Sequence, residues 1–147
     1  MANQDHLDKL RQGSIAWNQW LAQNPDKDIR PDLSYADLSG EDLNHFNLTH
    51  TDLRKANLTD TNLSNTFLHC TNFSSATLTR TNFSSAAFRC TILDNVDLQT
   101  AKGLETAHHL APSSIRNNTV GLSQGNIPKE FLEKIKDDYY DDECKYC

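Results

Sequence analysis

Glycine and proline are scarce in this sequence, whose 147 residues include only five glycines and four prolines. It contains no glycine-rich phosphate loop and no HExxH zinc motif, so the motif evidence for nucleotide binding and for metalloprotease activity is missing. The chain also has no run of about 20 apolar residues and no apolar secretory segment at its start. We therefore expect a cytoplasmic protein that does not enter a membrane.

Charge, histidine and cysteine content set further expectations. The formal net charge of −6 argues against nucleic acid as a direct ligand, because nucleic-acid-binding surfaces are basic. The six histidines are scattered and suggest no acid–base pair, so we expect neither enzymatic activity nor a cofactor. Since we expect a reducing compartment, we favour thiols over structural disulfides for the four cysteines.

A strict period of five residues runs through the middle of the chain. Every fifth residue from position 33 to position 98 is Leu or Phe, without exception. Mostly small residues stand two places earlier, and Asp or Asn usually stands one place earlier. Neither a helix nor an ordinary strand puts large apolar side chains on one side at this spacing. The ladder residues, which we expect to form the core, are Leu33, Leu38, Leu43, Leu48, Leu53, Leu58, Leu63, Leu68, Phe73, Leu78, Phe83, Phe88, Leu93 and Leu98.

A fixed short period indicates a solenoid, in which each unit buries its apolar face by stacking on its neighbour. Runs such as Tyr35-Ala36-Asp37-Leu38-Ser39 resemble pentapeptide-repeat proteins, and the resemblance covers about residues 31–102. It implies an all-β fold, a right-handed quadrilateral parallel β-helix in which each residue lies above the one twenty places earlier. We therefore expect about three and a half coils within residues 25–102, a rod about 17 Å long at ~4.8 Å per coil.

Caps are expected at both ends, because an open solenoid end exposes apolar rings and unpaired strand edges. In residues 1–24, apolar residues such as Trp17 recur at helical spacing and predict one amphipathic helix over 5–23, weakened by Gly13. Phe46, at an inward position that is normally small, would fill space in the first coil. Residues 103–147 are predicted to form a C-terminal cap with short helices over 105–110 and 128–136, followed by an acidic tail.

The cysteines raise the question of a disulfide or a metal site. Cys70 and Cys90 are twenty residues apart, so the register stacks them at one outward corner, about 4.8 Å apart at Cα and within the disulfide range. We favour two reduced thiols, with an oxidation-sensitive disulfide or redox pair as the alternative. His50 shares this column, but three residues in a line cannot surround a metal. Cys144 and Cys147 form a lone CxxC, and a site joining all four cysteines is a further alternative to the metal-free protein that we expect.

Three apolar residues stand at outward positions and are candidate partner contacts. Phe67 and Ile92 occupy places that usually hold Asp or Asn, and Ala87 stacks directly above Phe67. Exposed apolar spots of this kind can mark binding surfaces. The alternative interpretation, which we favour, is that the C-terminal segment or the N-terminal helix covers them.

Surface recognition is the remaining class of function. Some pentapeptide-repeat proteins are acidic rods that mimic DNA and bind DNA gyrase, but residues 31–100 here hold eight acidic and four basic residues on a short rod. We therefore expect a non-enzymatic protein–protein interaction module of unknown partner, monomeric or weakly dimeric. A DNA-mimic inhibitor or protector of gyrase is the first alternative and a purely structural scaffold the second. The segments Ala16-Trp17-Asn18-Gln19-Trp20 and Ala101-Lys102-Gly103-Leu104 resemble those that bracket the solenoid in cyanobacterial members.

Overall fold

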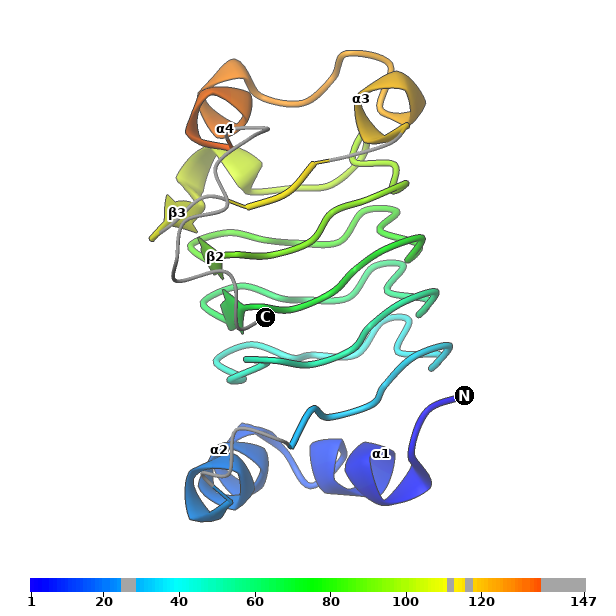
Figure 1. The fold of residues 1–147 in the computed structure, drawn as a ribbon, viewed down its shortest axis with the longest axis vertical. Coiled ribbons are helices and arrows are strands. Elements are labelled where there is room, and N and C mark those ends of the chain that lie inside the picture. Colours follow the sequence, from blue (N-terminus) through cyan, green and yellow to red (C-terminus); the bar gives the residue numbers. More distant parts are fainter. Residues whose placement is uncertain (25–28, 111–112, 116–117, 136–147) are drawn as a thin grey trace.

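The computed structural model describes residues 1–24, 29–110, 113–115 and 118–135. A stack of coils forms the body of the molecule, with two helices below its first coil and two helices above its last (Figure 1). Residues twenty apart lie side by side on neighbouring coils, as in the parallel bridges Asp32↔Asp52 and Asn62↔Asn82. The twenty-residue register predicted from the sequence is therefore present from residue 32 to residue 102.

Each five-residue side ends in a tight turn whose geometry explains the repeat. The backbone N–H of Ala36 donates to the carbonyl oxygen of Leu33 at 3.1 Å, and the third turn residue, Tyr35, has a φ of 61°. A positive φ at this position is typical of a type II turn. Every fifth residue from Tyr35 to Asn95 has a positive φ, Gly40 included. Where an Asp or Asn precedes the ladder residue it supports the turn, since its Oδ1 accepts a backbone N–H two residues later, as Asn82 does from Ser84 at 3.1 Å.

The core is the predicted ladder, and none of its fourteen side chains is more than 3% exposed. Phenylalanines fill its upper part, where the Phe83 ring lies 6.0 Å from that of Phe73 and 5.6 Å from that of Phe88. The small inward residues also join the coils, because threonine hydroxyls donate to carbonyl oxygens of the coil below, as Thr81 does to Leu58 at 2.8 Å. Neighbouring coils are thus connected by backbone ladders, side-chain hydrogen bonds and apolar packing.

The N-terminal cap consists of two helices, α1 (Gln4–Leu10) and α2 (Ser14–Gln23), where the sequence predicted one. Gly13 separates them with a φ of 94°, which continuous helix does not allow. Trp17 on α2 is fully buried, and its indole Nε1 donates to the carbonyl oxygen of Asn47 at 2.6 Å. Phe46 is also buried, with its ring 6.3 Å from that of Trp17. The cap therefore closes the first coil with aromatic side chains.

The solenoid continues beyond Lys102 with a shifted register. A 3₁₀ turn, η1 (Leu104–Thr106), precedes strand β3 (His108–His109), where a helix was expected over 105–110. Strands β1 (Phe67–His69), β2 (Ala87–Arg89) and β3 form a parallel sheet in that order. Ala87 pairs with His108, twenty-one residues later, so one residue has been inserted into the register. Ile92 pairs with Ser114, twenty-two residues later, so a second insertion follows.

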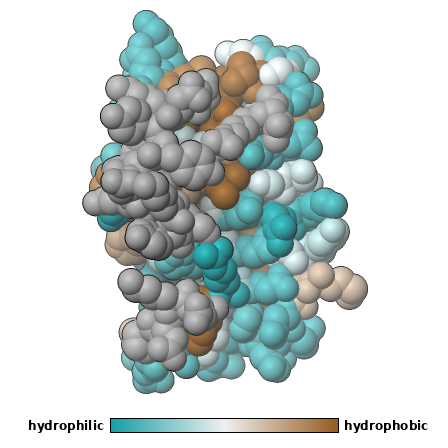
Figure 2. All heavy atoms as spheres, in the orientation of Figure 1, coloured by the Kyte–Doolittle hydropathy of each residue, from teal (hydrophilic) through white to brown (hydrophobic). Residues whose placement is uncertain are grey.

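Two short helices lie above this last coil, α3 (Thr119–Leu122) and α4 (Lys129–Lys134). The second of these was predicted from the sequence, beginning at Pro128. Phe131 on α4 is buried, with its ring 5.4 Å from that of Phe88 and 4.8 Å from that of His109. Among the residues coloured on the face drawn in Figure 2, most are hydrophilic and the apolar ones form small separate areas. None of the helices within the described ranges has the length and apolarity needed to cross a bilayer.

His109 is expected to make the stability of this cap depend on pH. Its ring stacks on Phe88 at 5.7 Å, and neither ring nitrogen has a hydrogen-bond partner in the parts of the chain that the structure describes. Burial, with the charges of Lys134 and His108, lowers the pKa of His109 from 6.5 to about 4. Its neutral form therefore contributes stability that is fully present above pH 6.5 and is lost as the pH falls through about 4.

The measurement is urea unfolding of the protein and of a His109→Phe variant between pH 4.5 and pH 7.5. Phenylalanine keeps the aromatic packing and cannot bind a proton. We expect the free energy of unfolding of the unmodified protein to fall more steeply on acidification than that of the variant. Parallel pH profiles would contradict the assignment.

Candidate functional site

An apolar groove lies on the outer face of the three-stranded sheet. Along β1, Leu68 points into the core while Phe67 and His69 lie on the outside. Phe67 is 56% exposed and Leu110, just after β3, is 65% exposed. Together with Ala87 and Arg89 they line a groove of about 270 Å³, whose far edge is formed by residues 47 and 49. The large aromatic side chain of Phe67 is thus exposed to solvent on a strand that is fixed by pairing with the neighbouring coil on each side.

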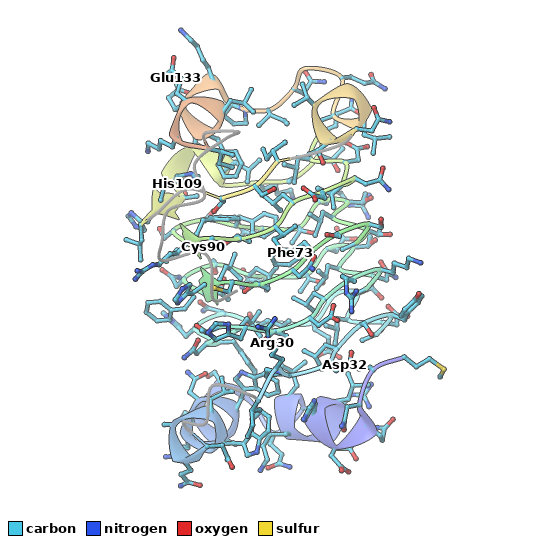
Figure 3. The ribbon with its side chains drawn as sticks, viewed as in Figure 1. Arg30, Asp32, Phe73, Cys90, His109 and Glu133 are labelled. Carbon is cyan, nitrogen blue, oxygen red and sulfur yellow. The ribbon has the colours of Figure 1, made fainter. Side chains whose placement is uncertain are left out.

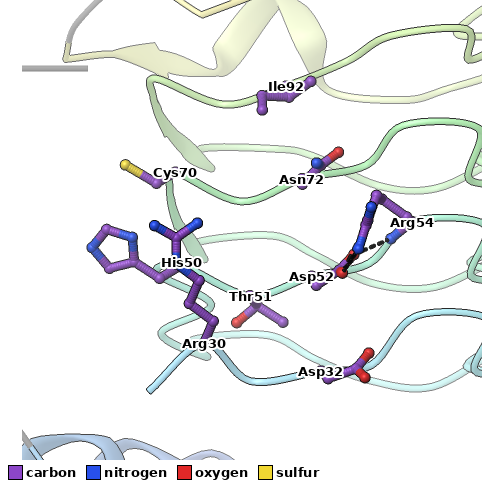
Figure 4. Close-up of a pocket in the computed structure, with 9 residues that line it drawn as sticks. All are labelled: Arg30, Asp32, His50, Thr51, Asp52, Arg54, Cys70, Asn72 and Ile92. Atoms are coloured by element: carbon purple, nitrogen blue, oxygen red, sulfur yellow. Dashed lines mark hydrogen bonds and ion pairs between the residues drawn. The ribbon is translucent and has the colours of Figure 1, made fainter. Parts of the chain in front are cut away.

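Two of the three predicted contact residues meet in this groove and the third does not. Phe67 pairs directly with Ala87, as the register predicted, and Ala87 is half-buried. Ile92 lies on another side of the stack, where it pairs with Asn72. It lines a separate cavity of about 350 Å³ with residues that include Asp32 and Asp52 (Figure 4). The apolar spots in the sequence therefore belong to two different surfaces.

Leu110 was missed by sequence reasoning, which placed it at the end of a helix. Gly103 stands where the next ladder residue would fall, but Leu104 supplies the large apolar side chain of the core, with 2% exposure. This shift carries the following residues into β3, and the backbone N–H of Leu110 donates to the carbonyl oxygen of Phe88 at 2.9 Å. The side chain of Leu110 consequently lies beside the groove. The available signal was the one-residue offset between Gly103 and Leu104.

A cluster of cysteine and histidine side chains lies at the corner next to the groove. Cys70 and Cys90 have φ values of 52° and 50° at equivalent turns of successive coils, and they are 7% and 6% exposed. Both are disulfide-bonded in the structure, contrary to the expectation of reduced thiols. One ligand atom each of His69, Cys70 and Cys90 lie within 4.8 Å of one another. The CxxC of Cys144 and Cys147 falls outside the described residues.

His50 lies close to this cluster. Its ring centroid is 5.4 Å from that of His69, and His50 and Cys70 line the same cavity (Figure 4). Burial lowers the pKa of His50 below 6.5, and the charge of Arg30 lowers it further. The imidazole is therefore neutral at physiological pH and can offer a nitrogen lone pair as a ligand.

The cavity that Ile92 lines also contains an ion pair, which lowers the pKa of the Asp52 carboxyl. The Asp52 carboxylate lies 2.6 Å from the Arg54 guanidinium (dashed in Figure 4). Burial of Asp52 acts to raise its pKa, but hydrogen bonds from the Arg54 side chain and backbone outweigh it and hold the pKa below 3.8. Asp52 is therefore a stable carboxylate, and its protonation is unsuited to general acid catalysis near neutral pH.

One serine in the C-terminal cap has the spacing of a hydrolase motif. Gly121-Leu122-Ser123-Gln124-Gly125 reads GxSxG, which in hydrolases is a strand-to-helix turn that exposes the serine. Here Ser123 follows helix α3 and is fully buried. Its Oγ donates to the carbonyl oxygen of Thr119 at 2.7 Å and accepts the backbone N–H of Leu98 at 2.9 Å. Ser123 therefore ties α3 to the last coil and is not placed as a nucleophile.

The comparison with protein families agrees with the coil register. Residues 32–69 and 68–102 match the family model for pentapeptide repeats, in eight copies. Residues 32–102 of this chain are pentapeptide repeats. The match ends at the residue before Gly103, where the inserted residue changes the spacing. No curated protein matches the sequence.

Solved pentapeptide-repeat structures from cyanobacteria resemble this pentapeptide-repeat protein. HetL from Nostoc sp. strain PCC 7120, described as involved in heterocyst differentiation regulation, is 26% identical, with a TM-score of 0.36 over 70% of this chain and 45% of HetL. The protein alr5209 from Nostoc PCC 7120 is 26% identical, with a TM-score of 0.40 over 66% of this chain and 79% of its own. Rfr23 from Cyanothece 51142 is 29% identical, with a TM-score of 0.30 over 61% of this chain and 60% of its own. The chain thus spans less than half the length of HetL.

Proposed function

We propose that this pentapeptide-repeat protein is a non-enzymatic protein-binding module that uses the groove around Phe67 as its contact surface. The observation that carries the proposal is that Phe67 is 56% exposed although it begins strand β1 and pairs with Ala87 on one side and Asn47 on the other. Large aromatic residues that are exposed yet rigidly held are typical anchors of protein interfaces. The exposed Leu110 enlarges the apolar surface beside it.

The chemistry of the groove favours a partner that presents an apolar side chain. Ala87 forms an apolar wall next to Phe67, and Arg89 and His69 contribute nitrogen-bearing side chains at the edge. Docking would require little ordering, because β1 and β2 pair along three residues each. A pre-organised surface loses less conformational entropy on binding than a flexible loop does.

DNA mimicry has weaker support. Two of the acidic side chains that such a mimic would display are paired with arginines in the repeats. Asp60 and Arg80 on successive coils form an ion pair at 2.5 Å, with about half of each side chain exposed. Asp52 and Arg54 form another, at 2.6 Å. A DNA mimic must present a continuous negative face to a DNA-binding protein. Acidic side chains that are paired with arginines do not build such a face.

We also propose finer features of the fold, which the repeat family supports. These are a right-handed quadrilateral β-helix and about three and a half coils within residues 25–102, at ~4.8 Å per coil. The protein is proposed to act as a monomer or weak dimer.

The test is capture of partners on immobilised protein, comparing the unmodified chain with Phe67→Ala and Ile15→Ala. Ile15 is the matched control because it is 75% exposed but lies on helix α2 and does not line the groove. We expect Phe67→Ala to weaken retention of a specific partner about tenfold or more, as for an interface anchor, and Ile15→Ala to leave it unchanged. If Phe67→Ala and Ile15→Ala retained the partner equally well, the groove would not be the contact surface.

A further inference from the structure

The corner formed by Cys70 and Cys90 combines the side chains that a soft divalent metal prefers. His69 ends strand β1, Cys70 follows at the turn, and Cys90 stands at the equivalent turn of the next coil. One ligand atom from each lies within 4.8 Å of the other two. Both cysteines are nearly buried, and His69 is half-buried. The turns that position the sulfurs are part of the coil stack, so the cluster is built on a rigid scaffold.

We propose that, once the disulfides are reduced, this corner binds one Zn²⁺ ion through Cys70, Cys90, His69 and His50. Two thiolates and two imidazoles are a frequent donor set of structural zinc sites. The proposal does not depend on the partner-binding groove.

For His69, Cys70 and Cys90 the geometry requires only small side-chain movements, and His50 would have to turn toward them. Zinc lies about 2.3 Å from sulfur and about 2.0–2.1 Å from nitrogen in a tetrahedral site, which places the ligand atoms ~3.3–3.8 Å apart. Three of the four are already within 4.8 Å of one another. His50 stands one coil below Cys70 on the same edge of the stack (Figure 4), and its ring centroid lies 5.4 Å from that of His69.

His69 supplies the ligand that allows a tetrahedral arrangement around the ion. His50, Cys70 and Cys90 share one column along the rod, and a column alone cannot surround an ion. His69 belongs to the neighbouring column, yet one of its ring nitrogens lies within 4.8 Å of both sulfurs. It thereby supplies a ligand away from the column axis. Figure 3 shows Cys90 at the same edge of the stack as β2 and below His109.

Oxidation state decides whether the site is available. In the structure both cysteines are disulfide-bonded, and zinc requires thiolates. A phosphine reductant supplies the two electrons for each S–S bond: phosphorus is oxidised to the phosphine oxide with oxygen from water, and two thiols form. Zinc binding then replaces the thiol protons of Cys70 and Cys90, which are released to solvent. Disulfide bonding of Cys70 and Cys90 and metal binding by them therefore exclude each other.

The experiment is a zinc titration of the full chain against a chromophoric chelator, under nitrogen, after reduction with a phosphine and removal of excess reductant. We expect one Zn²⁺ per reduced chain and none per oxidised chain. Substitution with Co²⁺ should give the intense visible bands of a tetrahedral thiolate site. The absence of stoichiometric binding by the reduced protein would overturn the proposal.

Variants then assign the ligands, with circular dichroism to verify that each retains its fold. Cys70→Ser/Cys90→Ser should weaken zinc binding roughly 100-fold or more, because even outer-shell changes cost 10–100-fold. His69→Gln and His50→Gln should weaken it in the same direction. Cys144→Ser/Cys147→Ser is the matched control and should bind normally. Normal binding by Cys70→Ser/Cys90→Ser, or loss of binding in the control, would overturn this ligand set.

Discussion

Replacing Phe83 with alanine is expected to lower the free energy of unfolding by about 3–5 kcal/mol, the usual cost of removing a buried phenylalanine. Phe83 is completely buried and contacts the rings of Phe73 and Phe88. The coil above cannot settle into the cavity, because the spacing between coils is set by the backbone hydrogen bonds. One of these runs from the N–H of Phe83 to the carbonyl oxygen of Lys102, at 2.8 Å. The cavity therefore persists, and its full cost appears in the stability.

Phe67→Ala is the matched control for this prediction, since it makes the same chemical change within the same solenoid. Phe67 is 56% exposed, so its loss should cost about 1 kcal/mol or less, as for most surface substitutions. Urea unfolding followed by far-ultraviolet circular dichroism measures both values. A Phe83→Ala protein as stable as Phe67→Ala would show that position 83 does not face the core.

Gly103→Ala is expected to destabilise the C-terminal end of the solenoid by about 2–4 kcal/mol, combining left-handed backbone strain with overpacking. Gly103 has a φ of 75°, and an added Cβ would lie 2.4 Å from the backbone nitrogen and 2.6 Å from the Cα of Ser84. Backbone atoms cannot rotate away as the end of a side chain can. The last coil would have to move outward from the coil below, weakening its pairing with β2.

Comparison with Gly40→Ala separates the cost of the left-handed backbone conformation from the cost of steric crowding by the added Cβ. Gly40 has a φ of 70°, but an added Cβ there would meet nothing within 4 Å. Its expected cost is about 1 kcal/mol, from the left-handed conformation alone. Amide hydrogen exchange provides a local readout: in Gly103→Ala the N–H of His108, which donates to the carbonyl oxygen of Ala86 at 2.9 Å, should exchange faster. It should be unaffected in Gly40→Ala, and equal effects of the two changes would contradict the crowding at Gly103.

The groove around Phe67 and the corner formed by Cys70 and Cys90 are expected to respond differently to oxidation and reduction of the cysteines. The groove around Phe67 needs only the folded coils, so oxidised and reduced protein should both display it. The cysteine corner, in contrast, depends on the state of Cys70 and Cys90. His69 is the one residue that belongs to both, since it lines the groove and approaches the sulfurs. Partner capture with and without zinc will show whether a metal at the corner alters the groove.

The five-residue period by itself determined the core, the turns and the stacking. Each ladder residue is inward because of its place within its own repeat, and each coil repeats the one before it. Such information is local, so it can be read directly from the chain. The pairing of Phe67 with Ala87 and the stacking of Cys70 with Cys90 follow from the same register of twenty.

Tertiary structure decided what lies outside that period. The residue inserted at Gly103 places Leu104 in the core, brings His109 against Phe88 and leaves Leu110 exposed beside Phe67. The break at Gly13 divides the N-terminal cap, and the arrangement of neighbouring columns places a ring nitrogen of His69 within 4.8 Å of the sulfurs of Cys70 and Cys90. A repeat specifies which residues stack above one another. It does not specify how side chains from adjacent columns meet, or how an interrupted coil packs on the last regular one, because these depend on side-chain shape and on contacts distant in sequence.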